Sequence, residues 1–138
     1  MNTVLFACVH NAGRSQMAAA LFNMLADGSK ARAISAGTEP SAHVHPEVVG
    51  VMRELGIDLG SAVPQKLTPE LAATVQILVT MGCGEACPVV PSATRFDWPL
   101  DDPKGQPIAR VLEIRDEIER RVRALLTERG WLEASHRA

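Results

Sequence analysis

The sequence predicts an α/β fold in which a central, mainly parallel four-stranded sheet is flanked by helices in a three-layer sandwich. Two observations carry this prediction. Apolar, β-branched segments alternate along the chain with segments of helical periodicity, and the apolar segments are continuous, as in strands buried on both faces of a parallel sheet. The chain has 138 residues, of which 46% are hydrophobic, which is enough for one buried core. We therefore expect one domain spanning residues 1–138.

The first half of the chain is expected to contain two strands and two helices. Residues 3–9, TVLFACV, form the first apolar strand, and the turn HNAGRS leads into a helix that ends at Gly28. Residues 31–37 form the second strand. Pro46 suits the first position of a second helix, whose apolar stripe ends at Gly56.

The second half is expected to add two strands and one long helix. A short helix within residues 68–73, TPELAA, precedes a buried strand at residues 75–81. A fourth strand around residues 93–96 leads to a proline-rich loop, and a long amphipathic helix follows between Ile108 and Gly130. We expect the tail, residues 132–138, to be frayed.

The charge and hydropathy of the chain exclude several classes of partner. The formal net charge is −2, from 14 basic and 16 acidic residues, so no global positive field attracts nucleic acid. No apolar run approaches the roughly 20 residues of a membrane helix, and the N-terminus lacks the pattern of an export signal. We therefore expect a cytoplasmic monomer with neither nucleic-acid nor membrane partners.

The three cysteines indicate thiol chemistry or a metal site. Cys8, Cys83 and Cys87 are an odd number in a chain without an export signal, which argues against a framework of structural disulfides. Ligands of parallel sheets bind beyond the carboxyl ends of the strands. The loops after the first, third and fourth strands share that edge, and they carry Cys8 to Arg14, Cys83 to Cys87, and Asp97 to Pro103.

The spacing Cys8-x5-Arg14-Ser15 at a strand-to-helix turn suits an oxyanion-binding loop. Gly13 allows backbone angles that a side chain forbids, the helix directs its positive end inward, and Arg14 can bind two oxygens at once. The same donors stabilise a thiolate, so we expect Cys8 to be nucleophilic at neutral pH, with a further hydrogen bond from Ser15. The spacing alone leaves open that Cys8 is a small buried apolar residue and Arg14 a surface cation. The expected donors to the oxyanion are Val9, His10, Asn11, Ala12, Gly13, Arg14 and Ser15.

Several motifs resemble one known family. CVHNAGRSQMA resembles the active-site loop of the low-molecular-weight protein tyrosine phosphatase family, and more closely that of its arsenate reductase branch. ISAGTEP, GIDLG, TMGCGEACP and DWPLDDP, followed by a helix containing RDEIERRV, are similar to segments of those reductases in the same order. The resemblance covers nearly the whole chain and implies a low-molecular-weight phosphatase-like fold.

The resemblance implies a role for each residue of the first loop. Cys8 attacks arsenate, Arg14 and the loop amides hold the oxyanion, and Asn11 braces the loop. Asp102, just before Pro103, is the general acid that protonates the departing oxygen, which otherwise leaves poorly. Asp97 and Asp101 remain rival candidates for this acid. Phosphate and sulfate are expected to compete with arsenate.

Reduction also requires electrons, which the remaining cysteines are expected to supply. In the family pattern, the thiolate of Cys83 attacks the arsenic adduct on Cys8, and Cys87 then attacks Cys83 and moves the disulfide to the surface. Thioredoxin reduces the final pair in some members. The short spacing of Cys83 and Cys87 is more similar to reductases that use mycothiol with a mycoredoxin. We expect an external thiol reductant of one of these types and no bound cofactor.

Three other interpretations remain. A phosphotyrosine phosphatase usually has an aromatic wall, and Trp98 is the one candidate here, in a chain without Tyr. A non-catalytic As(III) or redox sensor would leave Arg14 and Asp102 unexplained. A zinc site on Cys83 and Cys87 lacks further ligands at a suitable spacing.

Some family members bind potassium through acidic residues, but the matching positions in this chain are Ala19 and Gln65, so we expect no metal. The histidines considered as zinc ligands are His10, His43, His45 and His136.

Overall fold

The computed structural model describes residues 1–82, 90 and 92–136, and its centre is a parallel four-stranded sheet. The strands are β1 (Asn2–Cys8), β2 (Ala31–Gly37), β3 (Ile77–Thr80) and β4 (Thr94–Asp97), in the order β2-β1-β3-β4. All three strand pairs are parallel. The predicted α/β class and four-stranded parallel sheet are confirmed.

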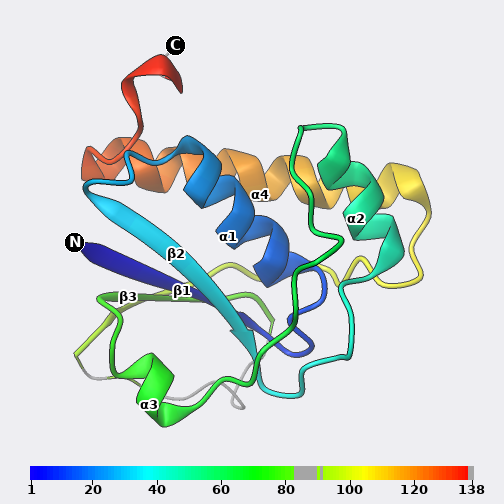
Figure 1. Ribbon diagram of the computed structural model, residues 1–138, viewed down its shortest axis with the longest axis horizontal. Coiled ribbons are helices and arrows are strands. Elements are labelled where there is room, and N and C mark those ends of the chain that lie inside the picture. Colours follow the sequence, from blue (N-terminus) through cyan, green and yellow to red (C-terminus); the bar gives the residue numbers. More distant parts are fainter. Residues whose placement is uncertain (83–89, 91, 137–138) are drawn as a thin grey trace.

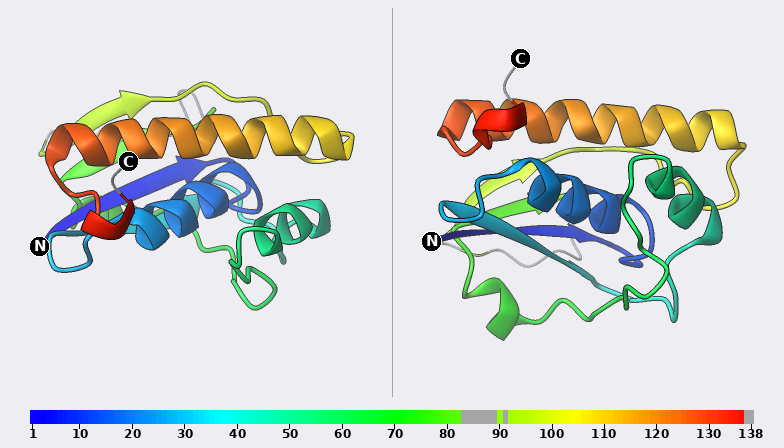
Figure 2. Two further views of the ribbon diagram at one scale, coloured as in Figure 1. Left: turned by 90° about the horizontal axis from the view of Figure 1, so that it is seen from above. Right: turned by 45° about the horizontal axis from the view of Figure 1, so that its top comes forward.

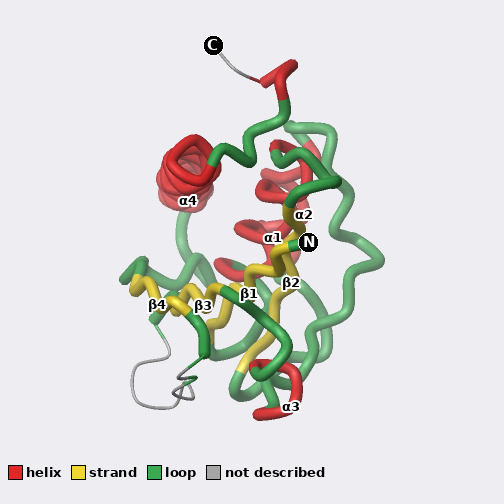
Figure 3. Tube along the Cα trace, turned by 90° about the vertical axis from the view of Figure 1, so that its left-hand side faces the viewer, coloured by secondary structure: helices red, strands yellow, loops and turns green. Residues whose placement is uncertain are grey.

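Helices cover the two faces of the sheet unequally, as Figures 1 and 3 show. One face carries α1 (Arg14–Leu25), α2 (Pro46–Arg53) and the long α4 (Ile108–Arg129). The other carries the single turn α3 (Pro69–Ala72). The larger core therefore lies between the sheet and the α1–α2–α4 layer. Fully buried side chains of that core include Phe6, Met17, Phe22, Ile114 and Ile118.

Most predicted boundaries agree with the structure to within two residues, and one expectation is wrong. The predicted strand at residues 75–81 is shorter, because the sheet pairing of β3 is confined to Ile77–Thr80. The tail expected to be frayed forms a short 3-10 helix at Ala134–His136. Tertiary contacts hold it, because Leu132 pairs with Ala26 in an antiparallel bridge and the Glu133 amide donates to the Leu25 carbonyl at 2.9 Å.

The register brings the carboxyl ends of the strands to one edge. Cys8 pairs with Gly37, and Thr80 pairs with both Ala7 and Asp97, so β1, β3 and β4 end side by side. The loops that follow β1 and β4 lie at this edge, beside the start of α1 and below α4 (Figure 2). Cys83 and Cys87 lie outside the described residues. In the described part of the chain, no helix has the length and hydropathy needed to cross a bilayer.

Candidate active site

The loop between β1 and α1 has its carbonyl groups held outward by the segment that follows β2. Four carbonyls at residues 8–12 accept hydrogen bonds from amides at residues 38–45, with N···O distances of 2.8–3.1 Å. The segment 38–45 therefore fixes the loop from outside through backbone atoms. The carbonyl and amide partners are Cys8 with Thr38, Val9 with Glu39, His10 with Ser41, and Ala12 with His45.

This arrangement turns the loop amides toward the centre of the loop. A trans peptide is planar, so each carbonyl points opposite to the amide of the next residue. Four outward carbonyls therefore aim the amides of Val9, His10, Asn11 and Gly13 inward. Within the described part of the chain, no amide from residues 9–15 donates a hydrogen bond. Together with the free first turn of α1, these amides can bind a tetrahedral anion.

Cys8 ends β1 at the floor of this loop, with its sulfur 2.8 Å from the hydroxyl oxygen of Ser15. The side chain of Asn11 fixes the direction of this hydrogen bond. The backbone amide of Gln65 can only donate, so the Asn11 atom 2.9 Å from it is the carbonyl Oδ1. Nδ2 of Asn11 then faces Ser15 and donates to its Oγ at 2.7 Å. The hydroxyl hydrogen of Ser15 is therefore free to point at the Cys8 sulfur.

The left-handed backbone conformation of the loop falls on Asn11 rather than on Gly13. Asn11 has a φ of 51°, a region that asparagine tolerates better than most residues. Gly13 has a negative φ of −142°, so the left-handed residue of the loop is Asn11 and not Gly13. Gly13 also leaves space, because a Cβ there would lie 2.8 Å from Cγ of Pro103.

Arg14 is buried beside the loop, with 7% of its surface exposed, so it is not a surface cation. Its Nη1 donates to the carbonyl of Leu100 at 2.9 Å, and its Nη2 lies 3.9 Å from a carboxylate oxygen of Asp102. These contacts involve two of the five N–H groups of the guanidinium. The remaining donors are available to an oxyanion in the loop.

The three candidate acids have different partners. Asp97 accepts hydrogen bonds from Thr80 and Arg95, which hold the pKa of its carboxyl below the usual value of 3.8. Asp101 pairs with Arg110 at 2.6 Å and raises the pKa of that arginine. Asp102 is the candidate that faces Arg14, while its other oxygen accepts from the Lys104 amide at 3.0 Å.

Of the residues considered as possible metal ligands, His10 and Gln65 have hydrogen-bond partners within the protein. Nδ1 of His10 lies 3.0 Å from the Glu39 carbonyl, at the half-exposed rim of the loop. Gln65 donates through Nε2 to the Ser35 carbonyl at 2.7 Å, and Ala19 is buried in the core. Among the described residues, no three of His, Cys, Asp and Glu gather as metal ligands. Cys83 and Cys87 are outside that part of the chain.

Trp98 packs into the core rather than lining the loop as an aromatic wall. It is 8% exposed, and its ring centroid lies 5.6 Å from that of Phe6. With Phe96 it lines a small cavity of about 190 Å³ against α4. The structure therefore assigns it a packing role.

Sequence reasoning missed the residues that support the loop through backbone atoms. The amides of residues 38–45 and of Gln65, and the carbonyl of Leu100, could belong to almost any residue type, so no side-chain pattern identifies them. Gln16, whose Nε2 donates to Oδ1 of Asn11 at 3.2 Å, was also missed. Its position two residues after Arg14 was the only available signal.

Comparison with known proteins agrees with this geometry. The family described as low molecular weight phosphotyrosine protein phosphatase matches residues 3–134. The chain belongs to this family. Within it, a putative arsenate reductase of Halobacterium salinarum is 40% identical over 127 residues, which is 89% of each chain. The resemblance to the arsenate reductase branch of the low molecular weight phosphatases is thereby confirmed.

Two further reductases of the family differ in the reductant that their names give. A glutaredoxin arsenate reductase of Synechocystis sp. is 32% identical over 131 residues, or 93% of this chain and 98% of the relative. The structure of a thioredoxin-dependent arsenate reductase of Corynebacterium glutamicum is 39% identical and superposes with a TM-score of 0.80. That comparison covers 93% of this chain, which spans 61% of the other chain's length.

Proposed function

We propose that this protein is an arsenate reductase that forms a cysteinyl-arsenate adduct on Cys8 and resolves it by a thiol–disulfide relay, for arsenic detoxification. The observation that carries the proposal is the sulfur of Cys8, 2.8 Å from the Ser15 hydroxyl, at the floor of a loop with inward amides. A nucleophile facing converging donors is what attack on a tetrahedral anion requires. The membership of the arsenate reductase branch supports arsenate as that anion.

In the first step, the thiolate of Cys8 attacks arsenic, an S–As bond forms and one As–O bond breaks. The departing oxygen takes a proton from Asp102 and leaves as water or hydroxide. Arg14 and the loop amides stabilise the negative charge on the remaining oxygens. The assignment of the acid to Asp102 is supported by its place beside Arg14, since Asp97 and Asp101 are each paired with another arginine.

In the second step, the thiolate of Cys83 attacks the sulfur of Cys8. A disulfide forms, the S–As bond breaks, and its electron pair stays on arsenic, so As(V) becomes As(III) and leaves as arsenite. Cys87 then attacks Cys83 and releases Cys8 as a thiolate. This relay rests on the sequence positions of Cys83 and Cys87 and on the arsenate reductase relatives.

An external thiol reductant regenerates the enzyme by reducing the disulfide between Cys83 and Cys87. The names of the relatives support thioredoxin or glutaredoxin as this partner. The short Cys83–Cys87 spacing supports mycothiol with a mycoredoxin as the alternative. The reaction belongs in the cytoplasm, where thiols are kept reduced.

The test supplies arsenate and NADPH with either thioredoxin and its reductase or a mycothiol–mycoredoxin system. We expect turnover that is abolished by Cys8→Ser and by Cys83→Ser, and lost with thioredoxin in Cys87→Ser. Asp102→Asn should lower kcat by about 10² to 10⁴. Turnover that survives both Cys83→Ser and Cys87→Ser contradicts the relay.

The same preparation distinguishes the other readings of the site. Hydrolysis of an aryl phosphate at much higher efficiency than arsenate reduction would identify a phosphatase instead. Tight As(III) binding without turnover under any of these reductants would identify a sensor.

A further inference from the structure

The backbone that follows β3 lies directly against the guanidinium of Arg14. Gly82 is the second residue after β3 and has a φ of +101°, a conformation that side chains disfavour. A Cβ at this position would overlap Nη1 of Arg14 and lie 3.4 Å from its Cζ. The space that a side chain of residue 82 needs is therefore occupied by the arginine.

A second contact of Nη1 of Arg14 comes from the loop that follows β4. Nη1 of Arg14 donates to the Leu100 carbonyl at 2.9 Å, and that carbonyl lies 3.8 Å from where a Cβ of residue 82 would be. The guanidinium is thus in contact with residue 82 and with the loop that carries Asp102. A Cβ at residue 82 would force Nη1 out of the position from which it donates to Leu100.

We propose that Gly82 is a positioning residue for oxyanion binding, and that it acts through Arg14. Its missing side chain leaves room for Nη1 of the guanidinium beside the chain after β3, so that the other N–H groups can bind an oxyanion in the loop. Any side chain at position 82 displaces the guanidinium and weakens binding of tetrahedral anions. The inference rests on the proposed function for its ligand class, but it concerns anion binding and not the redox steps.

Gly82 directly precedes Cys83, the expected second thiol, in the sequence. The glycine proposed to position Arg14 is therefore the last described residue before the segment that carries the expected relay cysteines.

The test measures phosphate binding at Cys8 in a Cys83→Ser/Cys87→Ser background, where Cys8 is the only thiol of the chain. The readout is the phosphate concentration that halves the rate of Cys8 alkylation by iodoacetamide. We expect Gly82→Ala to raise this concentration about tenfold, since a charge-assisted hydrogen bond is lost or lengthened. An unchanged concentration overturns the inference.

Gly56→Ala is the matched control for backbone strain. Gly56 also has a positive φ, +78°, but no atom lies within 4 Å of where its Cβ would be. For Gly56→Ala we expect the phosphate concentration that halves the rate of Cys8 alkylation to stay within about twofold of the parent value. A loss equal to that of Gly82→Ala would mean that backbone strain, and not contact with Arg14, causes the effect.

A double-mutant cycle with Arg14→Lys tests whether the effect passes through the arginine. The shorter lysine leaves room for a Cβ at residue 82, so we expect Gly82→Ala to change phosphate protection by less than about twofold in that background. A tenfold effect in both backgrounds overturns the inference. No arsenate or reductant is present in this assay. Its result therefore tests the role of Gly82 separately from arsenate turnover, and either one can fail while the other holds.

Two further measurements apply if Gly82→Ala does not fold. Gly82→Asn introduces the same Cβ on a residue that tolerates positive φ, and the same tenfold effect is expected. In the parent protein, Arg14→Lys should shift the NMR resonance of the Gly82 amide. No shift of that resonance would show that the contact is absent and would overturn the inference.

Discussion

The carboxamide of Asn11 sets the direction of a hydrogen-bond chain that ends at the sulfur of Cys8. Oδ1 of Asn11 accepts hydrogen bonds from the Gln65 amide and from Nε2 of Gln16. Nδ2 of Asn11 therefore donates to Oγ of Ser15. A hydroxyl that accepts from Nδ2 keeps its own hydrogen for the sulfur. Ser15 can then donate to the Cys8 sulfur, and a hydrogen bond to an ionised acceptor is stronger than one to a neutral acceptor.

Ser15→Ala should therefore slow the reaction of Cys8 with iodoacetamide at neutral pH, by roughly tenfold if one charge-assisted hydrogen bond is lost. The Cys83→Ser/Cys87→Ser background again makes Cys8 the only thiol. Ser41→Ala is the control, because Ser41 holds the loop through its backbone amide, which the substitution keeps. Equal slowing in both variants would mean that the Ser15 hydroxyl does not stabilise the thiolate.

Asp97 contributes stability that depends on pH. Its hydrogen bonds to Thr80 and Arg95 lower its pKa in the folded state below 3.8, so its charged form favours folding above the unfolded pKa. That contribution is lost as the pH falls through the lower, folded pKa. We expect the Tm advantage of the wild type over Asp97→Asn at pH 7 to shrink below about pH 4. An advantage that persists unchanged in acid would show that the carboxylate is not the source.

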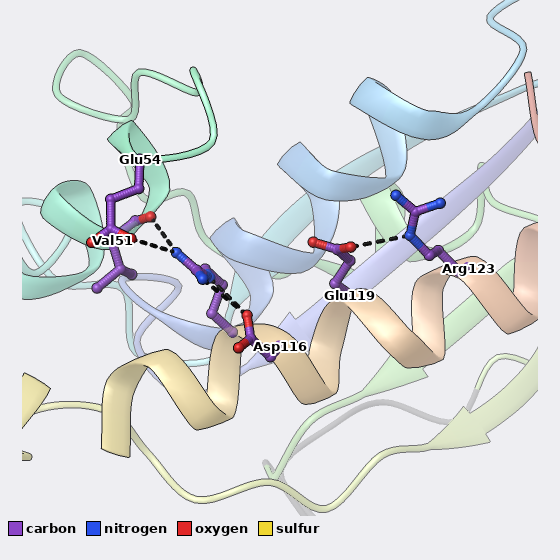
Figure 4. Close-up of polar contacts among 6 residues, drawn as sticks. Val51, Glu54, Asp116, Glu119 and Arg123 are labelled. Carbon is purple, nitrogen blue, oxygen red and sulfur yellow. Dashed lines mark hydrogen bonds and ion pairs between the residues drawn. The ribbon is translucent and has the colours of Figure 1, made fainter. Parts of the chain in front are cut away.

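At the scale of elements, Arg115 joins α4 to α2. Figure 4 shows Val51 on α2 and Glu54, the residue after α2, across from Asp116 on α4, and also the separate Glu119–Arg123 pair along α4. Arg115 donates through Nη1 to the Val51 carbonyl at 2.9 Å and pairs with Glu54 at 3.4 Å. The Arg115 side chain is 11% exposed, so its hydrogen bond to Val51 is largely shielded from water, whereas its partner Glu54 is 61% exposed. These contacts fix α2 just after the segment 38–45 that holds the loop between β1 and α1.

Arg115→Ala should lower the free energy of unfolding by about 1–3 kcal/mol, because it leaves the Val51 carbonyl without its charged donor. Arg120→Ala is the matched control on the same helix. Among the described residues Arg120 pairs with Glu117 alone, one turn away, and its side chain is 70% exposed, so its loss should cost less than about 1 kcal/mol. Urea denaturation measures both. Equal costs would mean that the contact between the helices adds nothing to stability.

The order and type of the elements could be predicted from sequence because each has a strong local signal. The apolar runs that became β1 and β2, and the helix stop at Gly130, depend on residues close together in the chain. The 3-10 helix at Ala134–His136 had no such signal, since it depends on the carbonyl of Leu25 about a hundred residues earlier. The clamp of residues 38–45 on the loop is hidden for the same reason, with the added difficulty that it uses backbone atoms only.

The candidate site also contains residues that the sequence indicates and residues that only the structure reveals. Cys8, Arg14 and Asn11 have side chains whose chemistry is visible in the sequence, and the structure brings them together. The fit of Gly82 against Arg14 joins residues 68 positions apart and involves no side chain at residue 82. Three-dimensional packing alone reveals a residue whose function is to leave space.

At the scale of the whole molecule, both edges of the sheet are protected against pairing with another chain. At the β2 edge, Asn23 bonds both the amide and the carbonyl of Ala33, and Gln65 donates to the carbonyl of Ser35. At the other edge, β4 is only four residues long and carries the exposed, charged Arg95 and Asp97. Short, charged or covered edges are the usual means of preventing association between sheets.

The exposed apolar surface is also dispersed, which favours a monomer. In the described residues, the large exposed apolar side chains are Met1, Val63 and Ile108, which belong to three separate segments. We expect light scattering after gel filtration to give the monomer mass of 14.8 kDa at all protein concentrations tested.

Asn23→Ala uncovers the backbone of Ala33 at the β2 edge and should raise the apparent mass or cause aggregation, because an unpaired strand edge can pair with another chain. Since Asn23 lies on α1 away from Cys8, its alkylation rate should not change in the fraction that remains monomeric. A wild-type dimer, or an Asn23→Ala variant as monomeric as the parent at every concentration, would contradict edge protection as the basis of the monomer.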